Sequence, residues 1–261
     1  MENQDINTLL EKYLRPLTFP VAVKITPERK VPEKYRQPSR FFGYRINLCQ
    51  GVNFARRYGW RLGFLEEDMA CPLSLPIFGF YPDPDFVTRG EHIYPDFTAT
   101  IEAAARTQAA QPKAEVGSIG GLLLGPLSAV DFEPDLVLVY GNPAQIVRLV
   151  QAALYQAGGA VQSQFSGRCA CAQEFIHPFL TQKCNVILPA QGERLFALTA
   201  DDEMAFSIPR NELAGVIQGL ETTHTRGVSR IPTPFFGMRM RPQFPERYQE
   251  LEVHCGIKKK E

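Results

Sequence analysis

The sequence has no excess of charge of either sign, because 28 Lys and Arg residues balance 28 Asp and Glu residues in a chain of 261. Without a net basic field, a protein has little long-range attraction for nucleic acid or for an anionic membrane. No apolar run approaches the roughly 18 residues of a membrane-spanning helix. The N-terminal segment also lacks the basic start and the continuous apolar stretch of a secretory signal. We therefore expect a soluble cytoplasmic protein that binds neither nucleic acid nor membrane.

Cysteine and histidine are scarce, with six and four residues respectively, and no pair of C-x-x-C elements exists. This spacing excludes the common zinc-finger patterns. In a reducing compartment the cysteines are more often free thiols, metal ligands or redox groups than structural disulfides. The expected partner is a small molecule or a metal centre, and the sequence leaves the oligomeric state open.

Hydrophobic residues make up 44% of the chain, enough for a substantial core, and we expect one domain over residues 1–261. Alternating and apolar runs predict strands, whereas 3.6-residue periodicity predicts helices. Their interleaving predicts an α/β or α+β fold with helices packed on a sheet. The Pro- and Phe-rich tail, residues 229–261, is expected to wrap over the body. Strands are predicted at residues 20–25, 41–44, 117–127, 136–140, 185–188, 194–199 and 204–208, and helices at residues 6–14, 97–110, 143–154 and 212–220.

The clearest local pattern begins with the apolar run Leu136–Tyr140 and continues into an amphipathic helix. Asn142 is placed to cap that helix and Pro143 to open it. A helix N-terminus attracts anions, so Asn142, Pro143 and Gln145 are candidate cofactor-binding residues. The acidic turn at residues 201–203 is interpreted as a solvated turn, as such turns most often are, with a cation or general-base site as the alternative.

A Gly-to-Cys interval of twelve residues occurs twice, from Gly59 to Cys71 and from Gly159 to Cys171. Each Gly ends a predicted helix, and each helix follows an apolar run that ends in Tyr. Residues 41–71 and 136–171 could therefore be two related strand-helix-strand units around a pseudo-two-fold axis, which would bring Cys71 and Cys171 together. Unrelated β-α-β units share such patterns for physical reasons, so coincidence is the alternative.

Four cysteines are candidate metal ligands: Cys49, Cys71, Cys169 and Cys171. Cys49 lies in the first turn of a predicted helix, where the positive end of the helix dipole favours thiolate. Cys169 and Cys171 share one face if their segment is extended. Three or four thiolates from separate segments suit an iron–sulfur cluster or zinc. A single cysteine is more often a small buried side chain, and Cys184 and Cys255 fit that description best.

Several strings together resemble the prokaryotic family catalogued as domain of unknown function 169, over about residues 9–220. They are PVAVKI, LCQGVNFARRYG, DMACP, GPLSAVDFEPDLVLVYGNPAQIVRLVQAALYQAGG, CAQEFIHPFL, NVILPAQGER and DDEMAFSIP. The resemblance implies recurrent cysteines at positions 49, 71 and 171, with a fourth at position 190. This chain has Ala190 there, so Cys169, Cys184 or a non-protein ligand would have to complete a four-ligand centre.

Three functions follow as alternatives. The first is a cysteine-ligated iron–sulfur or other metal centre acting in redox or cofactor chemistry. The second is a metal-free protein that holds an anionic or planar ligand with the aromatic segment 72–95 and the helix start at Asn142. The third is a thiol enzyme with Cys49 as its nucleophile.

Overall fold

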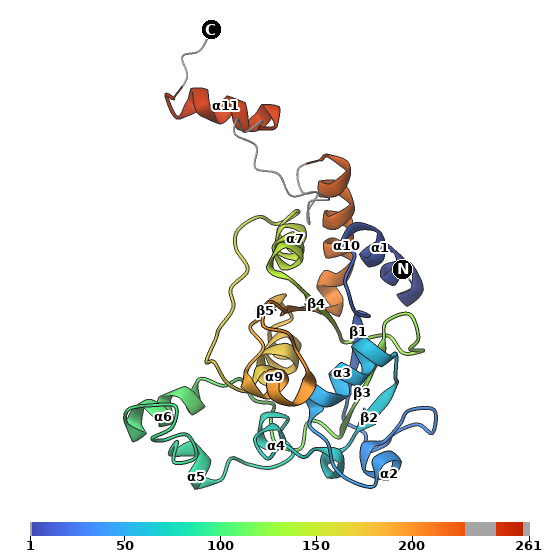
Figure 1. Cartoon of the computed structure of the whole chain (residues 1–261), viewed down its shortest axis with the longest axis vertical. Helices are drawn as coiled ribbons and strands as arrows, with labels where there is room; N and C mark the ends of the chain where they lie inside the picture. The colour runs from blue at the N-terminus through green and yellow to red at the C-terminus, as the bar shows by residue number, and fades with distance from the viewer. Residues whose placement is uncertain (1, 228–243, 258–261) are drawn as a thin grey trace.

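The body of the protein is an antiparallel sheet with helices on both faces (Figure 1). The computed structural model describes residues 2–227 and 244–257 of the chain. Within this part the sheet has six strands in the order β2-β3-β1-β4-β6-β5, and every pairing is antiparallel. The α+β class is thereby confirmed. The strands are β1 Val21–Thr26, β2 Leu62–Phe64, β3 Gly121–Pro126, β4 Leu136–Gly141, β5 Asn185–Ile187 and β6 Met204–Pro209.

Thirteen helical segments accompany the sheet in the described part of the chain. They are α1 Asn3–Tyr13, α2 Pro38–Phe42, α3 Leu48–Tyr58, η1 Glu66–Asp68, α4 Ser74–Ile77, α5 Asp85–Thr88, α6 Ile101–Ala109, α7 Pro143–Ala153, η2 Ala172–Ile176, α8 His177–Thr181, α9 Gln191–Ala197, α10 Arg210–Thr225 and α11 Glu246–His254. None of these helices combines the length and the apolar composition needed to cross a membrane.

Strand β4 divides the core into two layers, because successive side chains of a strand point to opposite faces. Leu136, Leu138 and Tyr140 belong to the layer that contains α3, whereas Val137 and Val139 belong to the layer that contains α1, α7 and α10. All six residues of β4 are buried, which explains why this strand forms a continuous apolar run rather than an alternating one.

Helices α7 and α10 pack against each other without intervening side chains at one point. A Cβ on Gly219 would lie 2.3 Å from the carbonyl oxygen of Ala152, so only glycine permits this approach. Figure 1 shows α1, α7 and α10 gathered beside one another in the upper half of the body. The stripe of apolar residues on α7 that the sequence predicts is the face buried here.

Two predicted strands are wrong. Residues 41–44 fall at the end of α2, which begins at Pro38 and ends at Gly43 with φ 78°. Residues 194–199 lie mostly in α9, where the Glu193 carboxylate accepts the Ala190 N–H at 2.9 Å and closes the first turn. In both cases the helix signals lie just before the apolar run, and they outweigh its strand propensity.

The two proposed repeat units share a helix, a glycine with positive φ and a cysteine. Segment 41–71 contains α3 and β2, whereas segment 136–171 contains β4 and α7 and reaches Cys171 through irregular chain. Gly59 and Gly159 have φ of 72° and 81°. The order strand, helix, strand is therefore not common to both segments, and duplication stays a prediction.

The predicted wrapping tail is only partly within the described residues. Residues 229–243 and 258–261 lie outside them. Helix α11 contains no buried residue, and it stands apart from the sheet in Figure 1.

Candidate cysteine site

Four cysteines from three segments line one cavity of about 370 Å³. Cys49 comes from the first turn of α3, Cys71 from the turn before α4, and Cys169 and Cys171 from the chain that leads into η2. Cys71 and Cys171, expected from the repeated interval to approach each other, do meet in this cavity. Ala190, where the family resemblance implies a cysteine, lines the same cavity.

The turn that carries Cys71 is held against the start of α3 by backbone hydrogen bonds. Ile46 N donates to Asp68 O at 3.1 Å, and Ala70 N donates to Ile46 O at 2.9 Å. The fully buried Asp68 carboxylate accepts three further bonds, from Gln37 Nε2, Ser39 N and Leu65 N. A carboxylate with this many donors fixes the loop backbone, which places Cys71 beside Cys49.

The segment that carries Cys169 and Cys171 has an unusual backbone. Cys169 adopts φ 50°, a left-handed conformation that is costly for residues other than glycine, and Gly167 has φ 72°. Cys171 immediately precedes the π-helix η2, a form found frequently at functional sites. Such strain persists only where the surrounding fold enforces it, and here it lies in the wall of the cavity.

Three of the cavity thiols, Cys49, Cys169 and Cys171, have raised pKa values, which favours their protonated form. Burial raises the pKa of Cys171 well above its usual value, with added repulsion from Cys169 and Glu193. Burial likewise raises the pKa of Cys169 to about 11, although the Arg168 guanidinium opposes this rise. The pKa of Cys49 is also raised, mainly by burial and then by Glu193 and Glu174. The predicted thiolate at Cys49 is therefore wrong, because burial and nearby carboxylates outweigh the helix dipole.

A chain of charged and polar side chains that sequence reasoning missed runs through the layer beneath the site. The Arg56 guanidinium pairs with both carboxylate oxygens of Glu203, at 2.6 and 3.0 Å. It also lies 4.2 Å from the centre of the Tyr140 ring, and the Tyr140 hydroxyl donates to Glu174 Oε1. Glu203, predicted to be solvated in an acidic turn, is instead 14% exposed. The available signal was Arg56 itself, which lies on the otherwise apolar face of α3.

Glu174 combines complete burial with an unsatisfied oxygen. Its Oε2 atom has no hydrogen-bond partner. Burial, followed by repulsion from Glu193, raises the pKa of Glu174 to about 8, while Tyr140 and Arg56 act in the opposite direction. A protonated carboxyl group is therefore favoured at neutral pH in the folded, metal-free protein.

We predict a pH-dependent contribution of Glu174 to stability. Its pKa is higher in the folded protein than the ordinary 4.5, so the folded state binds the proton more tightly between about pH 4.5 and 8. The stabilisation is full below pH 4.5 and is lost as the pH rises through 8. Denaturant unfolding of metal-free Glu174→Gln should show a shallower pH slope than wild type, by up to about 1.4 kcal/mol per pH unit. The exposed control Glu102→Gln should keep the wild-type slope, and an unchanged slope in Glu174→Gln would contradict the prediction.

The candidate residues Asn142, Pro143 and Gln145 lie outside the cysteine cavity. Asn142 caps α7 by accepting the Gln145 N–H at 3.0 Å, and Pro143 occupies the first turn, both as predicted. The Gln145 side chain accepts the Asn142 N–H and donates to the carbonyl oxygens of Leu14 and Arg15. The structure thus gives these residues a capping and anchoring role, and ligand binding there stays a prediction.

The remaining two cysteines lie elsewhere. Cys184 is buried in the layer of α7 and α10, in agreement with a packing role. The same prediction for Cys255 is wrong, because Cys255 is exposed at the end of α11, a helix that contains no buried residue. Over residues 2–227 and 244–257, no three His, Cys, Asp or Glu side chains stand in an arrangement that could directly hold a metal ion. A metal centre in the cysteine cavity would therefore require the thiols to rotate toward a common point.

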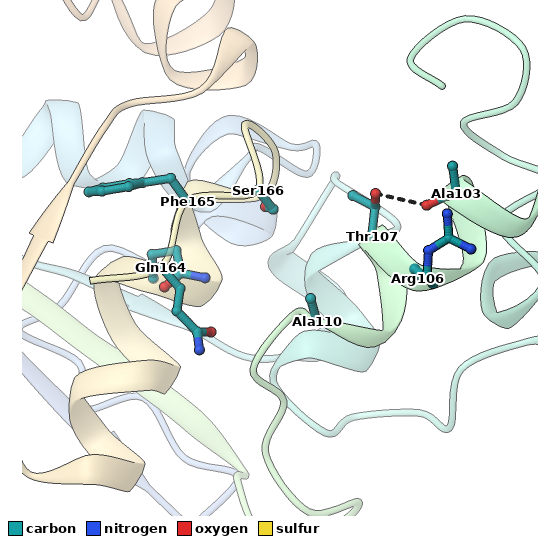
Figure 2. A pocket seen from close by; sticks show the side chains of 8 residues that line it. Ala103, Arg106, Thr107, Ala110, Gln164, Phe165 and Ser166 are labelled. Atoms are coloured by element: carbon teal, nitrogen blue, oxygen red, sulfur yellow. Dashed lines mark hydrogen bonds between the residues drawn. The ribbon is translucent and has the colours of Figure 1, made fainter. Parts of the chain in front are cut away.

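A second cavity of about 780 Å³ lies between α6 and residues 164–166 (Figure 2). Figure 2 shows the chain at Gln164–Ser166 on one side of the opening, with Thr107 of α6 and the following Ala110 on the other; the Phe165 ring points away from α6. The Ser166 hydroxyl accepts a hydrogen bond from Gln111 Nε2, which links the two walls. The segment that forms one wall of this cavity continues into Cys169 and Cys171.

Comparison with known proteins places the chain in a family. Residues 9–219 match the family described as DUF169, uncharacterised ArCR. The chain belongs to this family. An uncharacterized protein of Methanocaldococcus jannaschii, similar to this chain, is 34% identical over 205 residues, which cover 77% of this chain and 86% of that protein. No solved structure matches the chain. The matched residues include all four cavity cysteines and Ala190.

Proposed function

We propose that this DUF169 protein holds an iron–sulfur cluster in the cysteine cavity and uses it in redox or cofactor chemistry. The supporting observation is that Cys49, Cys71, Cys169 and Cys171 come from three separate segments yet line one hollow. Cysteines that served only as small packing residues would not be expected to converge on one hollow from separate segments.

The size of the cavity favours a polyatomic group over a single ion. Zinc sites close around one point at about 2.3 Å from each sulfur. The cavity of about 370 Å³ is roughly ten times the 30 Å³ that a water molecule occupies in the liquid. A cluster of several iron and sulfide atoms fills such a space better, and it is held by four cysteine thiolates.

Binding would also relieve the unfavourable charge pattern of the cavity. Glu193 and the nearby Glu174 are acidic groups, and burial raises the pKa of Cys49 and of Cys171. A metal centre binds thiolates, so its cations would replace the protons and compensate the negative charge. The cytoplasm, which we infer as the compartment, would keep these thiols reduced.

A metal-free small-molecule site is the second candidate. Leu73, Phe97 and Phe196 contribute apolar wall beside the cysteines, and the volume lies within the range of ligand pockets. Neutral thiols with raised pKa suit an apolar ligand. The third alternative, a Cys49 nucleophile, loses its support because the pKa of this thiol is raised.

Protein purified without oxygen tests the proposal. We expect a brown protein with broad visible absorption, several iron atoms per chain and a matching amount of acid-labile sulfide. Zinc found without acid-labile sulfide would show that the site holds a single zinc ion rather than a cluster. Colourless protein that takes up neither iron nor zinc after anaerobic reconstitution would overturn the metal proposal and favour the metal-free ligand site.

A further inference from the structure

Arg168 is the cationic side chain in the wall of the cysteine cavity. It directly precedes Cys169, and its guanidinium carbon lies 4.4 Å from the centre of the Phe97 ring, which lines the same cavity. Stacking on an aromatic face holds the planar guanidinium in a defined orientation. The cavity thus has a positively charged group fixed at its wall.

One donor of this guanidinium is unused. Arg168 Nη1 is buried and has no hydrogen-bond partner. Among the ion pairs formed by the described residues, none involves Arg168. A buried donor without a partner is costly even on a half-buried arginine, and such groups are normally satisfied in the functional state.

The opposite charge in this cavity comes from Glu193. Its carboxylate accepts the Ala190 N–H at 2.9 Å, so it is turned toward its own helix backbone. A monovalent anion at Arg168 meets weaker repulsion from Glu193 than a divalent phosphate does, because the Coulomb energy scales with the product of the charges. The planar fork of arginine matches the geometry of a carboxylate.

We propose that Arg168 binds the carboxylate of a small organic acid whose apolar body occupies the cysteine cavity. In the metal-free protein the cavity of about 370 Å³ accommodates such a molecule, and beside a cluster the molecule would occupy only the part next to Arg168; Phe97, Leu73 and Phe196 supply apolar contacts. As a substrate site beside the cluster, this assignment rests on the proposed function. Binding of the carboxylate by Arg168 can be measured in the metal-free protein as well.

Calorimetric titration of the full chain at fixed ionic strength tests the assignment. The probes are acetate, succinate, benzoate and inorganic phosphate, and the proteins are wild type, Arg168→Gln and Arg106→Gln. The control Arg106 is an exposed arginine in the neighbouring cavity. We expect at least one carboxylate to bind wild type, with affinity 10-fold to 100-fold weaker in Arg168→Gln and unchanged in Arg106→Gln. Preferential binding of phosphate would overturn the choice of carboxylate.

The alkylation rate of the neighbouring thiols locates the bound anion. With metal-free protein, a saturating carboxylate should slow N-ethylmaleimide labelling of Cys169 and Cys171 at least severalfold in wild type, and not in Arg168→Gln. Arg168→Lys keeps the charge without the planar fork and should bind with intermediate affinity. Absence of carboxylate binding up to millimolar concentration, or equal binding by Arg168→Gln, would overturn the proposal.

Iron and sulfide contents of the same variants separate this proposal from the proposed function. Arg168→Gln should retain the metal content of wild type, because arginine is not a metal ligand. Loss of carboxylate binding with intact metal content therefore reports on Arg168 alone. Carboxylate binding by a protein that takes up no metal would instead support the anion site and reject the cluster.

Discussion

Replacing both Cys71 and Cys171 by serine should lower the iron bound per chain to less than a tenth of the wild-type value. The two side chains lie in one cavity but on separate segments, so the double substitution removes ligands from two walls. Serine is nearly isosteric with cysteine, and its hydroxyl is a poor ligand for the soft metals that prefer thiolate. Iron and sulfide analysis, together with visible absorption after anaerobic reconstitution, measures the effect.

Cys184→Ser is the matched control for this loss. Cys184 is more buried than the cavity cysteines, and it packs in the layer of α7 and α10. The Cys184→Ser variant should retain the full iron content. Equal iron content in the double variant and wild type would show that the cluster, if present, lies elsewhere. Loss of iron from Cys184→Ser as well would indicate that disturbed packing, rather than ligation, causes the loss.

The converse substitution, Ala190→Cys, should strengthen metal retention. Ala190 lines the cavity at the position where the family resemblance implies a cysteine, and its neighbours in α9 are already ordered by Glu193. A cysteine at position 190 would therefore present its thiol to the cavity without any change in the backbone. We expect iron to be lost to a chelator at least severalfold more slowly than from wild type. Faster loss would indicate that a side chain at this position obstructs the cavity.

The sheet and the helices α1, α3, α6, α7 and α10 were predictable because their signals are local. β4 is a continuous apolar run, and α7 begins with Asn142 and Pro143, so strand, cap and helix follow from adjacent residues. The predictions failed at residues 41–44 and 194–199, where an apolar or aromatic run belongs to a short helix. There the residues of the first helical turn, Pro38 in α2 and Glu193 in α9, favour a helix over the strand that the run alone predicts.

The cysteine cavity was predictable in its membership but not in its chemistry. The spacing and the resemblance indicated Cys49, Cys71, Cys169 and Cys171, and all four line the cavity. The sequence could not show that burial would raise the pKa of Cys49, Cys169 and Cys171, since that depends on which distant segments cover them.

The contacts of Arg56 and Arg168 were likewise beyond sequence reasoning. Arg56 meets Glu203 across 147 residues of chain, and Arg168 meets Phe97 from a separate element. Neither pair has a signal in local spacing. Only the placement of an arginine among apolar residues, as on α3, could have indicated a buried partner.

Arg56→Met should lower the free energy of unfolding by about 3 to 5 kcal/mol. Arg56 is 1% exposed and is the partner of both Glu203 oxygens, so its removal leaves a mostly buried carboxylate without its main counter-charge. It also removes the cation from the Tyr140 ring. For a chain of this size the melting temperature should fall by roughly 10 °C. Denaturant unfolding and calorimetry of the metal-free protein measure both quantities.

Arg57 supplies the internal control, because it contacts the same carboxylate from a more exposed position. It donates to Glu203 Oε2 at 3.1 Å and is 34% exposed. Arg57→Met should therefore cost less than about 1 kcal/mol. The double variant Arg56→Met with Glu203→Gln removes the orphaned charge and should recover part of the loss, which gives the coupling between the two groups. Equal destabilisation by Arg56→Met and Arg57→Met would show that the burial of the Arg56–Glu203 pair adds no stability over that of the more exposed Arg57–Glu203 contact.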